Sequence, residues 1–151
     1  EYKLKALYIN SETDVALFEI PHGVIHPSFP YALGKSAELR VGNFIYIVGN
    51  PFNSGISVRP GIVSRIKLPN EENKDVFMIS NGIYPGDSSG LAIAIRDGEF
   101  ELVGLAKRVF RLASGQYIEQ LGEVLSIDTI RQVLVEAKEV PDEFKEFLKG
   151  F

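Results

Sequence analysis

The most informative stretch for the architecture of this chain is Leu91-Ala92-Ile93-Ala94-Ile95-Arg96-Asp97-Gly98-Glu99-Phe100-Glu101-Leu102-Val103-Gly104-Leu105-Ala106. Two apolar runs flank an Asp97-Gly98 pair, which is among the strongest short-range signals for a tight hairpin between antiparallel strands. Similar runs, rich in β-branched, aromatic and aliphatic residues, precede it at Tyr8-Ile9, 15–20, 44–48, 62–66 and 76–79. Turn residues separate the runs and no helical period lies between them. The sequence therefore predicts an antiparallel barrel or sandwich rather than alternating strands and helices.

Only the C-terminal end changes to a helical period. Ser126 can cap a helix over about 127–138. Its expected apolar face consists of Ile127, Ile130, Leu134 and Ala137. Pro141 suits the start of a second short helix, whose apolar stripe is Phe144, Phe147 and Leu148. We expect this tail to pack as a terminal helix; a partner-binding helix or a linker towards a further domain is the alternative.

Size and composition indicate one globular domain. The 151 residues are 45% apolar and 24% charged, with fourteen glycines and eight prolines, which fits neither a disordered tail nor a fibrous repeat. Sixteen basic against twenty acidic side chains give a net charge of −4, so we expect no nucleic-acid partner. No apolar run approaches the roughly 18 residues that a membrane span needs, so none is predicted in this chain.

The absence of cysteine and the N-terminal sequence bear on the origin of the chain. Zero cysteines exclude a disulfide framework, a Cys nucleophile and thiolate metal sites, and they leave the redox compartment open. The first five residues show neither an initiator Met nor a signal-peptide pattern. We therefore expect a fragment, shortened at its N-terminus.

The segment with the clearest chemistry is Tyr84-Pro85-Gly86-Asp87-Ser88-Ser89-Gly90-Leu91. A serine becomes a nucleophile where its loop exposes the oxygen and aims backbone N–H groups at a developing oxyanion. Gly86 permits such a backbone, and an apolar strand follows directly. The segment resembles the nucleophile loop of the chymotrypsin-fold serine proteases. Because Gly-Asp-Ser alone also makes ordinary β-turns, this interpretation depends on the flanking motifs.

Three further stretches resemble the bacterial HtrA/Deg-type branch of that family. Residues 13–20, TDVALFEI, look like the strand that begins at the catalytic aspartate. Residues 39–52, LRVGNFIYIVGNPF, are similar to the branch motif VGxxVxxIGNPF, and residues 57–64, SVRPGIVS, match TxTxGIVS. The resemblance spans roughly residues 4–138, and its motifs occur in family order.

The resemblance implies a mostly β fold with chymotrypsin-like antiparallel Greek-key β-barrels, the second complete and the first partial, followed by a C-terminal α-helix. We expect a remnant of the first barrel and the connector over 1–35, the second barrel over 36–125 and a helical segment over 126–151. In a fragment, the strands near Tyr8 and at 15–20 would lack pairing partners. Their exposed edges predict association, for example as a homo-oligomer.

The resemblance also implies catalytic roles. Ser88 would attack the scissile carbonyl, Asp14 would be the triad acid, and the backbone at Gly86, Asp87 and Ser88 would form the oxyanion hole through the N–H groups of Gly86 and Ser88. The family's histidine precedes the aspartate by a few tens of residues, but only thirteen residues precede Asp14 and none is His. Two positions depart from the family pattern: Asp87 stands where HtrA-type members commonly carry Asn, and Ser89 where they carry Gly, so its Cβ could crowd a close strand.

The predicted function is a serine endopeptidase of HtrA/Deg type that hydrolyses unfolded or misfolded proteins through a Ser-His-Asp triad whose His is absent from this chain. The chain alone is expected to be inactive. The alternative is a catalytically inactive barrel that binds peptides or another subunit. The resemblance favours an extracytoplasmic or periplasmic location.

The resemblance to HtrA/Deg-type proteases also implies a substrate pocket. Its residues would be Gly82, Ile83, Tyr84, Lys107, Arg108 and Val109. With Gly82 at the base, no carboxylate awaits Lys or Arg, and the apolar wall of Ile83 favours cleavage after Val, Ala, Ile or Leu. Extended substrate would pair with the backbone of 107–109.

Two other groups could carry chemistry. His22 and His26 are four residues apart, as in helical zinc sites, but Pro21, Gly23 and Pro27 argue against a helix. We interpret both as loop histidines and expect no metal and no cofactor. A Ser-Lys dyad with Lys107 is the minor alternative to the triad.

Overall fold

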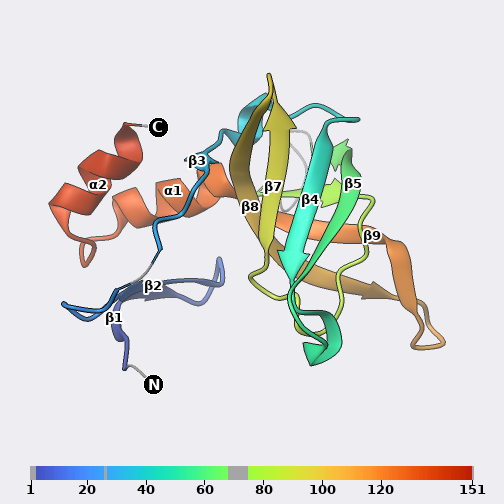
Figure 1. The fold of residues 1–151 in the computed structure, drawn as a ribbon, viewed down its shortest axis with the longest axis horizontal. Coiled ribbons are helices and arrows are strands. Elements are labelled where there is room, and N and C mark those ends of the chain that lie inside the picture. Colours follow the sequence, from blue (N-terminus) through green and yellow to red (C-terminus); the bar gives the residue numbers. More distant parts are fainter. Residues whose placement is uncertain (1–2, 26, 68–74, 151) are drawn as a thin grey trace. The chain divides into compact units, whose positions relative to one another are not determined.

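The computed structural model describes residues 3–25, 27–67 and 75–150. The chain forms two compact units, one of residues 31–129 and one that combines residues 1–30 with 130–151 (Figure 1). Among the described residues, no helix is both long enough and apolar enough to cross a membrane.

Residues 31–129 form a closed six-stranded antiparallel barrel. Its strands are β4 (Phe44–Gly49), β5 (Ser57–Ile66), β6 (Val76–Ile79), β7 (Leu91–Arg96), β8 (Glu99–Arg111) and β9 (Tyr117–Ser126). Hydrogen-bonded neighbours follow the order β4–β5–β6–β9–β8–β7, and β7 pairs back to β4. A short strand β3 (Ala32–Leu33) joins β8 in parallel. The mostly β fold with a complete Greek-key barrel is therefore confirmed.

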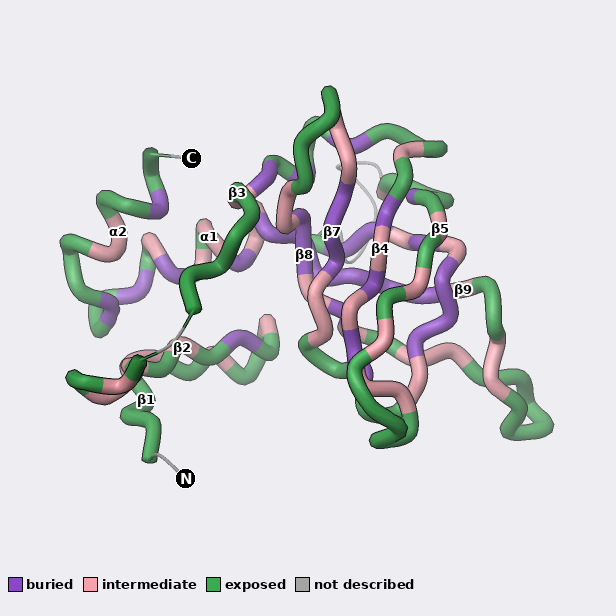
Figure 2. Tube along the Cα trace, viewed as in Figure 1, coloured by how far each residue is buried: buried purple, intermediate pink, exposed green. Residues whose placement is uncertain are grey.

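The barrel interior follows from the two-residue alternation of its strands. Along β4, Ile45 and Ile47 are fully buried while Phe44 is 66% exposed. Figure 2 shows buried positions along β4, β7 and β8. Each such aliphatic side chain contributes roughly 1.5–3 kcal/mol by leaving water. The core that results holds the ends of the strands, and hence the loops between them, in fixed places.

The hairpin between β7 and β8 confirms the first prediction. Asp97 and Gly98 both have positive φ, 51° and 84°, as a two-residue type I′ turn requires. Arg96 and Glu99 pair directly across the turn. The chain direction thus reverses where the Asp-Gly pair predicts it.

Other strands are longer than expected or absent from the prediction. β5 begins at Ser57, before the apolar run at Ile62 but where the match to TxTxGIVS starts. β8 extends to Arg111, and no apolar run predicts β9. The first half of β9 is partly exposed and polar, with Glu119 and Gln120 interrupting the apolar pattern, whereas its second half is buried. β9 nevertheless completes the barrel by pairing with both β6 and β8.

In the other unit, β1 (Lys5–Asn10) and β2 (Val15–Glu19) form a two-stranded antiparallel sheet. The prediction that these strands lack partners is wrong, because they pair with each other. The side-chain Oδ1 of Asn10 accepts the N–H groups of Glu12 (3.0 Å) and Thr13 (3.1 Å), which tightens the turn between the strands.

Two helices close the chain: α1 (Ile127–Glu136) and α2 (Asp142–Lys149). Ser126 Oγ accepts the N–H of Asp128 (3.2 Å), which confirms the predicted cap. The four residues of the predicted apolar face are all buried, although α1 ends two residues earlier than expected. In α2, Leu148 is buried and Phe147 is 51% exposed.

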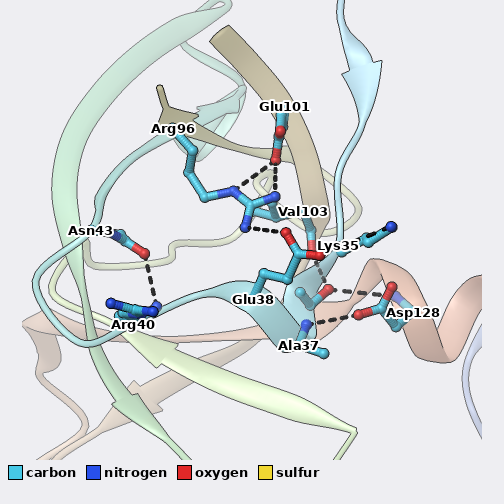
Figure 3. Close-up of polar contacts among 10 residues, drawn as sticks. Lys35, Ala37, Glu38, Arg40, Asn43, Arg96, Glu101, Val103 and Asp128 are labelled. Carbon is cyan, nitrogen blue, oxygen red and sulfur yellow. Dashed lines mark hydrogen bonds and ion pairs between the residues drawn. The ribbon is translucent and has the colours of Figure 1, made fainter. Parts of the chain in front are cut away.

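The start of α1 is also tied to the barrel. Ser36 Oγ accepts the N–H of Ile127 (2.9 Å) and donates to Val103 O (2.9 Å). The N–H of Ala37 donates to Asp128 Oδ2 (2.8 Å; Figure 3). The bond from Ile127 satisfies an N–H group that the start of α1 otherwise leaves without an acceptor.

Candidate active site

The candidate site is built on the loop of residues 84–90, which leads directly into β7. At its end the backbone joins β8: the N–H of Ser89 donates to Ala106 O (2.9 Å), and the N–H of Ala106 donates to Gly90 O (2.8 Å). At its start, the N–H of Phe52, from the β4–β5 connection, donates to Pro85 O (2.6 Å). Both ends of the loop are thus fixed by the barrel.

The loop presents Ser88 and two backbone donors. Ser88 is exposed. The N–H of Asp87 donates to Tyr84 O (2.9 Å) and that of Ser89 is used by β8, whereas those of Gly86 and Ser88 donate to nothing in the described part of the chain. Since backbone N–H groups seek acceptors, this alternation leaves two donors for an outside oxygen.

Glycine is required at two loop positions. Gly86 has φ of +96°, and a Cβ there would collide with the carbonyl of Asn50. At Gly90 a Cβ would lie 2.7 Å from Val48 O and from Asp87 O. The close strand approach is therefore at Gly90, while Ser89 is exposed and its unusual feature is a φ of +63°.

Asp87 is fully buried, although it carries a carboxylate. Its Oδ2 lies 2.7 Å from Arg59 Nη2 and accepts the N–H of Tyr84 (2.9 Å). The backbone of Gly49 approaches closely on the Oδ1 side, where a Cβ would collide with the carboxylate. Asp87 therefore points into the barrel, while Ser88 beside it faces out.

Arg59, on β5, reaches several parts of this loop. Its Nη1 donates to Gly82 O (2.9 Å), and its guanidinium lies 5.5 Å from the ring centre of Tyr84. The side chain of buried Asn81 donates to Arg59 O (2.7 Å). Arg59 is not predicted as a functional residue from the sequence; the available signal is that Arg59 and Asp87 both depart from the motifs in which they stand.

The six expected pocket residues lie in one region of the barrel. Gly82 and Ile83 are buried, and Ile83 belongs to the core, against which Val109 packs. Val109 pairs with Gly122, where a Cβ would lie 2.8 Å from Ile83 Cγ1, so these three residues are neighbours.

The remaining pocket residues lie around this apolar part. The Tyr84 ring packs near the rings of Phe52 and Tyr117, with distances between ring centroids of 5.3 Å and 5.8 Å. A Cβ added to Gly82 would lie 2.8 Å from the Tyr84 hydroxyl. Lys107 and Arg108 lie on β8, and Arg108 Nε is 3.4 Å from the buried carboxylate of Glu123.

Asp14 lies in the other unit. It is exposed, has φ of +61°, and stands in the turn directly before β2. Its participation in one catalytic centre with Ser88 stays a prediction.

The histidines are not on a helix where the structure describes them. His22 lies in a turn in which the N–H of Val24 donates to Pro21 O (3.3 Å), and His26 lies outside the described residues. Among the described residues, no group of three or more acidic or histidine side chains is arranged to hold a metal ion.

Comparison with known proteins gives a consistent result. The profile of the trypsin-like peptidase domain matches residues 1–105. A DegP-like periplasmic serine endoprotease of Pseudomonas fluorescens is 32% identical over 117 residues, which cover 76% of this chain and 23% of that protein. Its counterpart in Hahella chejuensis is 35% identical over 85 residues, or 55% of this chain and 18% of that protein. The chain thus spans less than a quarter of the length of these relatives.

Solved structures agree with the sequence matches. The HtrA-type protease AlgW bound to a tripeptide has a TM-score of 0.69 at 26% identity, covering 87% of this chain and 42% of that chain. AlgW with a decapeptide has the same TM-score and identity, covering 86% of this chain and 38% of that chain.

Proposed function

Because this chain belongs to the trypsin-like peptidase family and resembles its HtrA-type members, we propose that it carries the nucleophile Ser88 and the acid Asp14 of a serine endopeptidase. The observation that carries the proposal is the loop of residues 84–90. It exposes Ser88 and leaves the N–H groups of Gly86 and Ser88 without acceptors in the described part of the chain.

The proposed reaction is acyl transfer to Ser88. Its Oγ forms a bond to the scissile carbonyl carbon, its proton passes to a histidine, and the carbonyl oxygen becomes an oxyanion that accepts the N–H groups of Gly86 and Ser88. Collapse of this intermediate breaks the C–N bond, and the amine leaves with the proton. Water then attacks the ester and regenerates Ser88. Each oxyanion donor is worth about 10²- to 10³-fold in kcat.

The general base comes from outside these 151 residues in this proposal. His22 and His26 both follow Asp14, in the segment after β2, and neither matches the family's position. Without the base, the chain alone retains on the order of 10³- to 10⁴-fold catalysis over water, which is far below useful turnover.

Unfolded or misfolded polypeptides are the proposed substrates. Pairing between β7 and β8 ends at Leu91 and Leu105, so among the described strands the backbone of 107–109 has β9 on one side and no strand on the other. An extended peptide can add there as a strand, which a folded segment cannot do. The apolar surroundings of Ile83 and Val109 favour Val, Ala, Ile or Leu at the cleaved position.

The proposed location of this protein is extracytoplasmic. The relatives are named as periplasmic proteases, which supports an extracytoplasmic location for this chain. Self-association stays a prediction. β1 and β2 pair with each other, so each strand has one edge that is already hydrogen-bonded.

A catalytically inactive, peptide-binding barrel is the second candidate. Two observations favour it: Ser89 adopts φ of +63°, and the Tyr84 hydroxyl lies close over Gly82 in the expected pocket.

Turnover of an unfolded protein separates the two candidates. The longest natural reading frame that contains this sequence should degrade reduced, unfolded casein, and Ser88→Ala should abolish that activity while peptide binding persists. Binding without cleavage in the unmodified protein would favour the inactive barrel. Sequencing the cleaved peptides tests the pocket, because a preference for Lys, Arg, Asp or Glu at the cleaved position contradicts the expected apolar one.

A further inference from the structure

We propose that Arg59 is a positioning residue that holds the nucleophile loop in its oxyanion-binding shape through the buried carboxylate of Asp87. The inference rests on the proposed function of Ser88, which it deepens by assigning a residue that no motif identifies.

The burial of Asp87 makes the loop dependent on a cation. A carboxylate removed from water is costly unless it is paired and hydrogen-bonded. Asp87 is 0% exposed, its Oδ2 faces Arg59 Nη2 at 2.7 Å, and its Oδ1 accepts no hydrogen bond from the described residues. Besides Arg59, only the N–H of Tyr84 compensates this carboxylate among the described groups.

Arg59 contacts the loop at more than one point. One guanidinium nitrogen pairs with Asp87 and another donates to Gly82 O. The guanidinium carbon lies 5.5 Å from the centre of the Tyr84 ring. Its side chain therefore links the start of the loop to the residue just before Ser88. Arg59 itself stands on β5, whose backbone is fixed by pairing with β4. The anchor is thus a rigid strand rather than a second loop.

The same contact controls the backbone that carries the donors. Tyr84 and Asp87 are joined twice, since the N–H of Tyr84 donates to Asp87 Oδ2 and the N–H of Asp87 donates to Tyr84 O. Gly86 lies inside this small ring with φ of +96°. A glycine peptide can rotate readily, so the direction of the Gly86 N–H depends on the ring remaining closed. Without Arg59, the Asp87 carboxylate is more stable when it turns out to water, and this movement breaks the hydrogen bonds between Asp87 and Tyr84.

The first test is kinetic and uses the longest natural reading frame. In Arg59→Gln, kcat on an unfolded substrate should fall about 100-fold, the effect of losing one oxyanion donor, while KM changes less than about threefold. Adding Asp87→Asn removes the unpaired charge, and the double variant should regain at least about tenfold over Arg59→Gln, because contacting residues are not additive. An undiminished kcat in Arg59→Gln, or no recovery in the double variant, overturns the proposal.

A matched control separates positioning from general stability. Arg96 is the last residue of β7, at the end away from the loop of residues 84–90, and its side chain is 16% exposed, against 24% for Arg59. It pairs with Glu101 and Glu38 (Figure 3). Arg96→Gln should leave kcat per folded molecule within about twofold, since its partners do not touch the loop. Should Arg59→Gln not fold, Arg59→Lys serves instead: an ammonium lacks the fixed fork by which Arg59 contacts Gly82 O and Asp87 through separate nitrogens, so kcat should still fall about tenfold.

The second test needs no catalysis, so it distinguishes a failure of this inference from a failure of the proposed function. Amide hydrogen exchange at Asp87, whose N–H donates to Tyr84 O, should accelerate at least about tenfold in Arg59→Gln, while exchange at Ala106 stays unchanged. Unchanged exchange at Asp87 overturns the proposal even where the unmodified protein is inactive. If exchange at Asp87 is faster in Arg59→Gln but the unmodified protein is inactive, the role of Arg59 in the loop is supported. Only the proposed protease activity is then contradicted.

Discussion

Two arginines of the barrel each bridge acidic groups, yet they do different work. Arg96 links Glu101 of β8, 2.5 Å away, to Glu38, 2.9 Å away, and those carboxylates are 20% and 55% exposed (Figure 3). Among the described residues, Arg59 pairs with one carboxylate, that of Asp87, which is fully buried. Partly exposed carboxylates keep some water when their partner is lost, whereas a buried one does not. From this difference we expect the buried pair, and not the exposed one, to affect the shape of the loop that carries Ser88.

The largest effect is expected from Arg59→Leu. This change leaves the Asp87 carboxylate buried without its cation and should lower the free energy of unfolding by about 3 kcal/mol. Urea denaturation of the 151-residue chain measures it. A loss below about 1 kcal/mol would mean that Asp87 reaches water easily, and the contrast with Arg96 would disappear.

A smaller loss is expected from the opposite partner, Asp87→Ala. The Arg59 side chain that remains is 24% exposed as a whole, although its Nε and Nη2 are buried, and it keeps its hydrogen bond to Gly82 O, whereas Asp87 is fully buried. The free energy of unfolding should therefore fall by only about 1–2 kcal/mol. Denaturation of this variant beside Arg59→Leu checks the asymmetry. Equal losses for the two variants would argue that burial of the carboxylate is not the controlling cost.

Arg96→Met should cost less again, about 1 kcal/mol, because its acidic partners remain partly hydrated. Partial burial lowers the pKa of Arg96, but its hydrogen bonds to Glu101 and Glu38 outweigh this effect and raise the pKa above the ordinary value. A raised pKa means that the contribution is present below the unfolded-state value and is lost only as the pH rises through the folded-state value. The difference between Arg96→Met and the unmodified chain should therefore stay constant from pH 7 to about pH 10. A difference that vanishes in this range contradicts the assignment.

The smallest effect is expected from Ser89→Gly. Ser89 has φ of +63°, a conformation that costs a non-glycine residue about 1–2 kcal/mol. Glycine avoids this cost, but it loses more conformational entropy on folding, which offsets part of the gain. We expect a gain of about 0.5 kcal/mol in the free energy of unfolding, readable as a small rise in Tm. A loss of stability would mean that the Ser89 side chain makes a favourable contact.

The sequence predicts features that depend on neighbours along the chain. The Asp97-Gly98 hairpin, the apolar run of β4 and the Ser126 cap each require only a few adjacent residues, and the sequence predicts all three. β9 was missed because Glu119 and Gln120 disguise a strand whose first half is partly exposed. The prediction that β1 and β2 lack pairing partners is wrong, because the short turn between the two strands allows them to pair with each other.

Features that depend on closure of the barrel could not be read from the sequence. Ser36 caps a helix that starts 91 residues later, and Arg59 meets Asp87 only when β5 and the loop after β6 are brought together. The motif predicts that Ser88 is exposed in a tight loop, which agrees with its place in the fold. The cation that holds this loop is set by tertiary contacts, for which no local pattern exists.

Covalent labelling of Ser88 tests the central claim most directly. The longest natural reading frame that contains this sequence should react with a fluorophosphonate, which forms a stable adduct with an activated serine. Peptide mapping by mass spectrometry should then find the adduct on Ser88, with no adduct in the Ser88→Ala variant and slower formation in Arg59→Gln than in Arg96→Gln. A folded, unmodified protein that stays unlabelled, or carries the label on another residue, contradicts the account.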